Sequence, residues 1–191
     1  MNIFVLDASP LRAAEMHCDK HVPKMVLETA QIMSTVLNEK GLKGAYKSTH
    51  KNHPCTVWAG QSFANYMWTM ALGMALGLEY EQRFGRTHKS ADVIWEMKDT
   101  PIRVLRDAFD QDEMTDWVLA MPDEYKCRDA VHSYREYHRG EKIRLRSGRV
   151  DEMRHIGGPR SRIRCCNVTP KIILLTLLTS NALPFIFPLL S

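Results

Sequence analysis

The segment from Pro54 to Leu78 contains no Asp, Glu, Lys or Arg. An uncharged segment of this length must be buried, either in a membrane or in the centre of a helical protein. Several polar side chains and three glycines interrupt it, which makes it a poor isolated membrane span but allows close helix packing. The sequence therefore predicts a central buried helix from Pro54 to about Phe84, with Gly85 as its C-terminal stop.

A second long helix is predicted from Ser9 to Leu37, because Pro10 suits the first helical position and most of the segment is apolar. Its polar side chains recur at steps of four and three residues, which places them on one narrow stripe. The stripe consists of His17, His21, Lys24, Glu28, Gln31 and Thr35. Ionisable groups that are buried with an apolar helix must be paired, and such pairs are frequent at active sites.

We therefore expect the first four members of the stripe to be catalytic. Lys24 is predicted to act as a desolvated amine nucleophile or an electrostatic clamp, and Glu28 as a general acid/base. His17 and His21 are predicted to orient a leaving group or a phosphate. The alternative is a packed helix whose only solvent-facing strip is this stripe, with Lys24 and Glu28 as a simple i,i+4 pair and a kink at Pro23.

Ten further polar residues are predicted to bind substrate. Arg83 offers a fork for a phosphate, and Asn65 an amide that can read a base edge. The full set is Asp7, His50, His53, Asn65, Tyr66, Glu79, Arg83, His88, Asp123 and Lys126. Helix capping by the histidines, an intrahelical Glu79–Arg83 pair and a capping role for Asp123 are the structural alternatives.

The remaining segments complete a mainly α-helical, single-domain prediction for residues 1–139, built around the two long buried helices. The apolar run Asn2–Leu6 predicts a short N-terminal β-strand. Loops are predicted over 38–52 and 120–126, and shorter helices over 90–117, with a break at Thr100–Pro101, and from about Arg128 to Arg139.

Residues 140–171 are predicted to be a basic irregular segment, and residues 172–191 form an uncharged apolar tail of doubtful origin. A membrane anchor, an appendage and a non-native terminus are the alternatives for the tail. Residues 139–191 hold ten Lys or Arg and three Asp or Glu, a balance of +7, so the net charge of +4 leaves −3 for residues 1–138. This balance weakens an argument for nucleic-acid binding from overall charge.

Composition places the chain among ordinary globular proteins, with 45% hydrophobic and 25% charged residues in 191. Its five cysteines form no CxxC pair, which favours a reducing, cytoplasmic setting. No stable membrane association is expected, because polar residues and glycines interrupt the uncharged segment from Pro54 to Leu78.

Six blocks occur in order along residues 1–139: MNIFVLD, HCDKHVPKMVLETAQIMST, THKNHPCTVW, ANYMW, EYEQRFGRTHKS and AMPDEYK. In these blocks the chain resembles a family of small, largely uncharacterised proteins encoded by tailed bacteriophages and some bacteria. The genetic context of that family implies a nucleotide or DNA substrate and, for a phage protein, the host cytoplasm. The sequence departs from the family pattern after about Lys142.

Together these patterns predict a phage-type enzyme of DNA metabolism that acts on a nucleotide or on DNA, with cleavage of a glycosidic bond as the leading reaction. No cofactor and no tightly bound metal are expected. One alternative is a non-catalytic factor that binds a nucleotide or a host protein. The other is a metal-dependent hydrolase whose ligands are His17, His21, His50 and His53, since histidines at such spacings can bind a metal.

Overall fold

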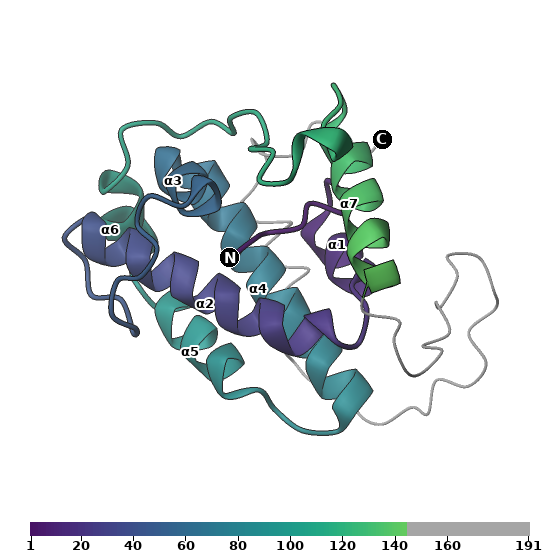
Figure 1. The fold of residues 1–191 in the computed structure, drawn as a ribbon. Coiled ribbons are helices and arrows are strands. Elements are labelled where there is room, and N and C mark those ends of the chain that lie inside the picture. Colours follow the sequence, from purple (N-terminus) through teal and green to yellow (C-terminus); the bar gives the residue numbers. More distant parts are fainter. Residues whose placement is uncertain (145–191) are drawn as a thin grey trace, which may run out of the picture. The chain divides into compact units, whose positions relative to one another are not determined.

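The computed structural model describes residues 1–144 and is mainly α-helical, as predicted (Figure 1). Its helices are α1 (Pro10–Met16), α2 (His21–Glu39), α3 (Pro54–Gln61), α4 (Phe63–Phe84), α5 (Lys89–Lys98), α6 (Ile102–Asp107) and α7 (Ala130–Arg144), with a 3₁₀ turn at Asp123–Tyr125. The break predicted at Thr100–Pro101 separates α5 from α6. Helix α7 continues five residues beyond the predicted domain boundary at 139.

Helices α2 and α4 form the centre of the fold, as the two apolar segments predicted. Helix α2 packs against α3, α4 and α5, while α4 also contacts α1. Two glycines of α4 permit this close approach. A Cβ atom on Gly73 would lie 2.8 Å from side-chain atoms of Thr29 in α2 and Ile94 in α5, and one on Gly77 would lie 2.8 Å from the Cβ of Ala91. Larger residues at these positions would push the helices apart.

The first predicted helix is divided in two, and residues 17–20 belong to neither α1 nor α2. Main-chain carbonyls at the end of a helix lack intrahelical partners. Here the Arg83 guanidinium of α4 donates to the carbonyl oxygens of Glu15, at 3.0 Å, and His17, at 2.6 Å. Pro23 therefore falls in the first turn of α2, where its missing N–H removes no intrahelical hydrogen bond. The break, rather than a kink at Pro23, changes the chain direction.

The second predicted helix is also divided, at Ser62. This residue is extended, with φ −142° and ψ 159°, and its Oγ accepts a hydrogen bond from the main-chain N–H of Asn65 at 3.1 Å. Serine is a favoured N-cap because it satisfies such a free N–H group. Gly85 ends α4 with φ 66°, which confirms the predicted stop.

The predicted N-terminal β-strand is wrong, since the residues that the structure describes contain no strand. The Asn2 side-chain oxygen accepts hydrogen bonds from the N–H groups of Ile3 and Phe4, at 2.8 and 3.0 Å. Phe4 has φ 35°, and the Leu6 N–H bonds to the Phe4 carbonyl at 2.7 Å. A curled, buried coil results, because local partners take the donors that a neighbouring strand would need.

The segment between α6 and α7 crosses the ends of α3 and α4 as a largely irregular chain. Trp117 packs against two tryptophans of these helices, with ring centroids 5.0 Å from Trp58 and 4.7 Å from Trp68. The Trp58 indole N–H also donates to the Asp116 carbonyl at 2.9 Å. The aromatic cluster thus anchors a segment that has little regular structure of its own.

Within residues 1–144, no helix combines the length and the apolar character needed to cross a membrane. The uncharged segment that begins at Pro54 is instead divided between α3 and α4. The predictions for the apolar tail 172–191, and for the basic segment beyond residue 144, concern residues outside the described part of the chain.

A chain shortened after Ser147 is expected to keep its fold, because the first compact unit comprises Met1–Ser147. The helical circular dichroism signal of residues 1–144 and the cooperative thermal unfolding should match those of the full chain. Ending the chain at Arg139 would instead cut within α7 and provides the comparison. Loss of cooperative unfolding in the 1–147 chain would contradict this assignment of the domain.

Candidate functional site

The polar stripe does not form one site. His17 lies outside both helices, in the turn between α1 and α2, and His21 is the first residue of α2. Glu28 lies seven residues further along α2, which corresponds to about 10 Å along the helix axis. The two histidines therefore join a different group of side chains from that around Glu28. The helix break removes His17 from the predicted stripe, whereas His21 stays on α2 with Lys24 and Glu28 but packs against Phe4 and His138.

Glu28 is the centre of the first group. Its side chain is 13% exposed, and its Oε2 accepts a hydrogen bond from the Asn2 main-chain N–H at 2.9 Å. Its Oε1 lies 4.0 Å from the α-amino nitrogen of Met1 and 3.7 Å from the Nζ of Lys24. A largely buried carboxylate is thus held between two amines.

Met1 is partly exposed although its side chain is buried. That side chain is 3% exposed, whereas the residue as a whole is partly exposed, so the exposed surface is mainly main chain. The Asn2 side chain fixes this end of the chain by donating to the Ala120 carbonyl at 2.8 Å. The arrangement places a primary amine beside a largely buried carboxylate.

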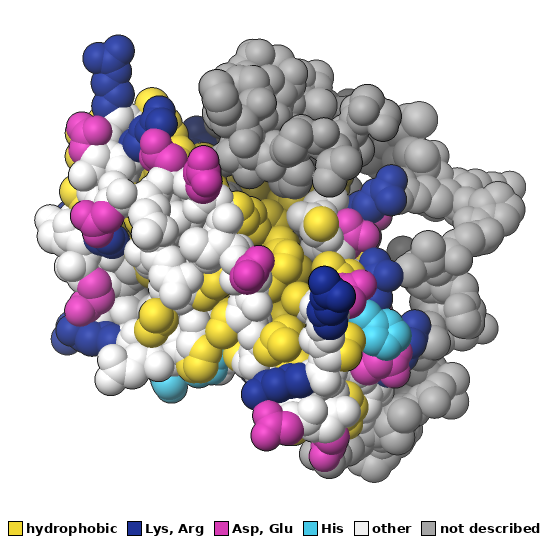
Figure 2. Space-filling model, turned by 90° about the horizontal axis from the view of Figure 1, so that it is seen from above, with side chains coloured by type: hydrophobic (Ala, Val, Ile, Leu, Met, Phe, Trp, Pro, Cys, Tyr) yellow, Lys and Arg dark blue, Asp and Glu magenta, His cyan; other side chains and the backbone are white. Residues whose placement is uncertain are grey.

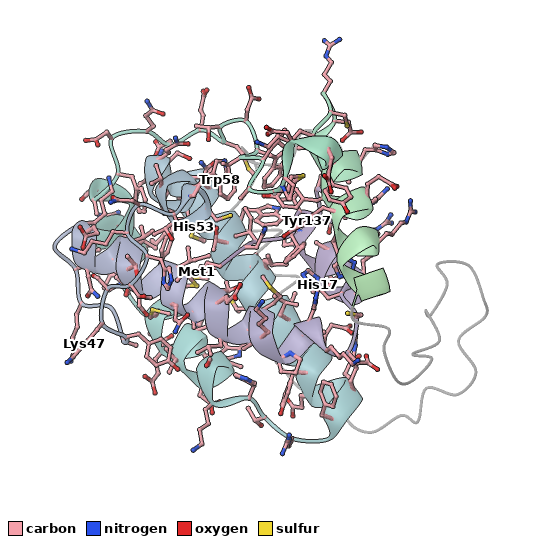
Figure 3. The ribbon with its side chains drawn as sticks, in the orientation of Figure 1. Met1, His17, Lys47, His53, Trp58 and Tyr137 are labelled. Carbon is pink, nitrogen blue, oxygen red and sulfur yellow. The ribbon has the colours of Figure 1, made fainter. Side chains whose placement is uncertain are left out.

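His53 borders this group from the start of α3 (Figure 3). Burial lowers the pKa of His53, and the positive charge at the Met1 amino group lowers it further, against the opposing effect of Glu28. The His53 Nδ1 accepts a hydrogen bond from the Cys55 N–H at 3.2 Å. A neutral imidazole therefore lies near the amine and caps α3, which agrees with the capping alternative for this residue. Burial also raises the pKa of the Cys55 thiol to about 11, so this thiol stays protonated.

Lys24 does not have the environment that a lysine nucleophile requires. Its side chain is 65% exposed, and its Nζ approaches Glu28 as an i,i+4 neighbour. Desolvation, which was the reason for expecting a reactive amine at this position, is therefore absent. The arrangement agrees better with the electrostatic role that the sequence also suggested.

His17 and His21 lie in an aromatic group with Phe4 and His138. The ring centroid of His138 is 5.7 Å from that of His17 and 4.8 Å from that of His21, while Phe4 packs against all three imidazoles. Figure 3 shows His17 well separated from His53. The histidines expected to form a four-histidine metal site therefore belong to two different places in the fold.

Asn65 and Tyr66 belong to the core rather than to a binding surface. The Asn65 amide donates to the Trp58 carbonyl, at 2.8 Å, and to Thr115 Oγ1, at 2.7 Å, and accepts from the Thr115 N–H at 3.1 Å. It has no remaining capacity to read a base edge. Tyr66 is fully buried beside Phe109, and burial raises the pKa of its phenol.

Arg83 and Glu79 also have structural roles. Besides the two carbonyls at the end of α1, the Arg83 guanidinium contacts the carboxylates of Asp19 and Glu79, at 3.1 and 2.6 Å. Its fork is thus committed within the protein and is not available for a phosphate. The Glu79 partner agrees with the intrahelical alternative.

The other predicted substrate-binding residues are dispersed. Asp7 binds Arg135 of α7, and His88 caps α5. The His50 ring contacts the Thr49 hydroxyl, and the backbone of His50 has a positive φ of 50°. Burial lowers the pKa of His88. Asp123 is 94% exposed and pairs with Lys126 at 2.7 Å, and this ion pair lowers the pKa of the Asp123 carboxyl. None of these contacts brings the residues to Glu28.

The surface gives no sign of a single basic face on the side that Figure 2 shows. Lys and Arg side chains lie among Asp and Glu side chains there, and hydrophobic side chains gather in a band across the middle. A shallow depression lined by Gln61, Gln111, Thr115 and Asp116 includes none of the predicted site residues. Substrate recognition by a broad positive surface is not indicated on this side.

Two participants leave no signal in the sequence, the Met1 amino group and the Asn2 main chain. A chain terminus has no pattern or spacing, so only its proximity to Glu28 in the fold reveals it. Comparison with known proteins adds no assignment, because no family model matches the chain and no curated protein or solved structure resembles it significantly.

Proposed function

We propose that the protein is an enzyme that cleaves a glycosidic bond in DNA or a nucleotide, with the α-amino group of Met1 as its nucleophile and Glu28 as its general acid/base. The observation that supports this proposal is the primary amine 4.0 Å from a largely buried carboxylate. The resemblance to phage proteins supports the substrate class. For a phage protein, the proposed setting is the cytoplasm of the host cell.

The surroundings of the two amines favour Met1 over Lys24 in this role. The Asn2 side chain fixes the chain terminus by donating to the Ala120 carbonyl, whereas the Lys24 side chain is 65% exposed. An unprotonated amine is the nucleophile in Schiff-base chemistry. Glu28 can accept the proton that the α-ammonium loses, and Lys24 can stabilise the carboxylate or bind a phosphate.

In the proposed reaction the amine lone pair forms a bond to C1′ of the sugar while the bond from C1′ to the base nitrogen breaks. The electron pair of the broken bond leaves with the base, which takes a proton from the solvent. Glu28 accepts the proton released from the attached nitrogen and can return it to open the sugar ring. Opening of the ring gives an imine between C1′ and the chain terminus, and water later hydrolyses this imine.

The test uses an oligonucleotide with a single abasic site, whose ring-opened sugar has a free aldehyde. Condensation of the amine with this aldehyde releases water, and borohydride reduces the imine to a stable secondary amine. We expect a covalent adduct that peptide mass spectrometry locates on Met1. Extension of the N-terminus by Gly-Ser should abolish the adduct, because it moves the amine away from Glu28.

Two controls separate this proposal from its alternatives. The same two residues added at the C-terminus should leave trapping unchanged, and Lys24→Met should retain most of it. An adduct located on Lys24 that survives the N-terminal extension would assign the nucleophile to Lys24 instead. Absence of any adduct, with retained binding of the oligonucleotide, would favour the non-catalytic binding factor.

A further inference from the structure

Three metal-ligating side chains that the proposed reaction does not use lie together at the turn between α1 and α2. The Cys18 thiol and a ring nitrogen from each of His21 and His138 all lie within 4.8 Å of one another. Both imidazoles are buried, whereas Cys18 is partly exposed. The group therefore faces the protein on one side and solvent on the other.

The start of α2 places the first two ligands together. The Cys18 carbonyl accepts hydrogen bonds from the N–H groups of His21 and Val22, at 2.8 and 3.1 Å, and so begins the helix. This turn leaves the thiol and the imidazole three residues apart, a spacing used by metal sites in which two ligands share one turn. The third ligand, His138, comes from α7, at the other end of the described chain.

The turn that bears Cys18 is held in place by contacts from α4. Arg83 donates to the His17 carbonyl at 2.6 Å and contacts the Asp19 carboxylate at 3.1 Å, so both neighbours of Cys18 are fixed. Interactions that orient ligands in this way are a regular part of metal sites. The turn is thus positioned before any ion binds.

The donor set suits a divalent ion of the zinc type. Zinc binds thiolate sulfur at about 2.3 Å and imidazole nitrogen at about 2.0–2.1 Å, with tetrahedral geometry. Those bond lengths place neighbouring ligand atoms roughly 3.3–3.8 Å apart. The three ligand atoms lie within 4.8 Å of one another, so they need to move closer by only about 1 Å. Rotation of the three side chains can supply this movement.

Aromatic rings pack around the two imidazoles of this group. The His21 and His138 ring centroids lie 4.8 Å apart, and the Phe4 ring packs 5.4 Å from His21 and 5.6 Å from His138. The apolar wall excludes water from the imidazole side. The partial exposure of Cys18 leaves the solvent side open for a fourth ligand such as water.

We propose that Cys18, His21 and His138 bind Zn²⁺ and thereby tie α7 to the turn between α1 and α2. This site is independent of the proposed reaction at Glu28. It replaces the four-histidine set considered from the sequence, since only His21 is common to both, and it reverses the expectation that no metal is tightly bound.

The test is titration of the chelator-treated full chain, under reducing conditions, with Co²⁺ as a spectroscopic probe for Zn²⁺. We expect a thiolate-to-cobalt charge-transfer band in the near ultraviolet, together with the visible bands of tetrahedral Co²⁺. Added Zn²⁺ should displace both. Cys18→Ser should remove the charge-transfer band, and His138→Asn should weaken metal binding at least about 100-fold, since even losing a residue that only orients a ligand costs 10–100-fold.

Matched controls are a cysteine and a histidine that lie outside the proposed ligand set. Cys127→Ser and His132→Asn change an exposed cysteine and an exposed histidine of α7, and should leave the bands unchanged. A Cys165→Ser/Cys166→Ser chain excludes signals from cysteines outside the described residues. An absent charge-transfer band in the unmodified chain, or an unchanged one in Cys18→Ser, would overturn the proposal.

Thermal unfolding of the unmodified chain and of Cys18→Ser provides a second readout. Zn²⁺ in hundredfold excess over its Kd should raise the Tm of the unmodified chain by about 5 °C or more, because a ligand that binds only the folded state stabilises it. The same Zn²⁺ concentration should leave the Tm of a folded Cys18→Ser chain nearly unchanged. An equal rise in both chains would place the metal elsewhere.

Discussion

Replacement of Glu28 with Gln is expected to slow borohydride trapping of the abasic oligonucleotide by about 10²–10⁴-fold, the range of contributions from a general acid/base. The amide cannot accept the proton that Met1 must lose before it attacks. Its carbonyl oxygen can still accept the hydrogen bond from the Asn2 N–H, so the chain terminus should remain in place. The measurement is the single-turnover rate of adduct formation at fixed pH.

The matched control for this variant is Glu39→Gln. Glu39 also belongs to α2, but its carboxylate is 47% exposed and pairs with Lys51 at the far end of the helix. The Glu39→Gln substitution removes the same charge from the same helix but makes no change near the Met1 amine. Trapping should therefore proceed at the original rate. Equal rates in Glu28→Gln and the unmodified chain would exclude Glu28 as the proton acceptor. Glu28 and the Met1 amine would then form only a structural ion pair.

Replacement of Asn65 with Leu is expected to lower the free energy of unfolding by about 2–4 kcal/mol. The substitution keeps the approximate size of the side chain but leaves the Trp58 carbonyl and the Thr115 N–H without their partner. An unsatisfied buried polar group costs about 1–3 kcal/mol, and here there are two. Urea unfolding followed by circular dichroism measures the difference.

Thr69→Val tests whether the effect is specific to this network. Thr69 lies one helical turn after Asn65 and is fully buried, but its hydroxyl donates only to the Asn65 main-chain carbonyl. The valine chain should lose less than about 1 kcal/mol, since that carbonyl remains within the helix. A loss below 1 kcal/mol for Asn65→Leu as well would show that the segment around Thr115 does not depend on the amide.

Local sequence signals located the helices more accurately than the connections between them. Ser62 and Gly85 are both favourable capping residues, but only the glycine predicts a helix end. A serine within an apolar helical pattern can also be accommodated inside the helix. The break after Met16 has no comparable local signal. It depends on Arg83, more than sixty residues away, which binds the carbonyl groups that α1 leaves free.

The candidate site shows the same division between local and long-range information. Glu28 was correctly expected to lie in a mostly buried position, because helical periodicity placed it on a narrow polar stripe. Its partner was not predicted, since Lys24 is adjacent on the helix surface whereas Met1 reaches Glu28 only through the folded chain. Asn65 was expected to need partners, but the backbone of residues 58 and 115, not a ligand, supplies them.

Apolar periodicity, the absence of charge after Pro54 and a few capping residues were sufficient to determine that this protein is mainly helical and built on two buried helical segments. These are properties of neighbouring residues, which share one backbone geometry and therefore leave a regular pattern in the sequence. Only the tertiary structure decided that Met1 lies beside Glu28, that Arg83 divides the first helix, and that Cys18 and His21 lie next to His138. Such contacts join distant segments, and their geometry follows from how whole helices pack rather than from any local spacing.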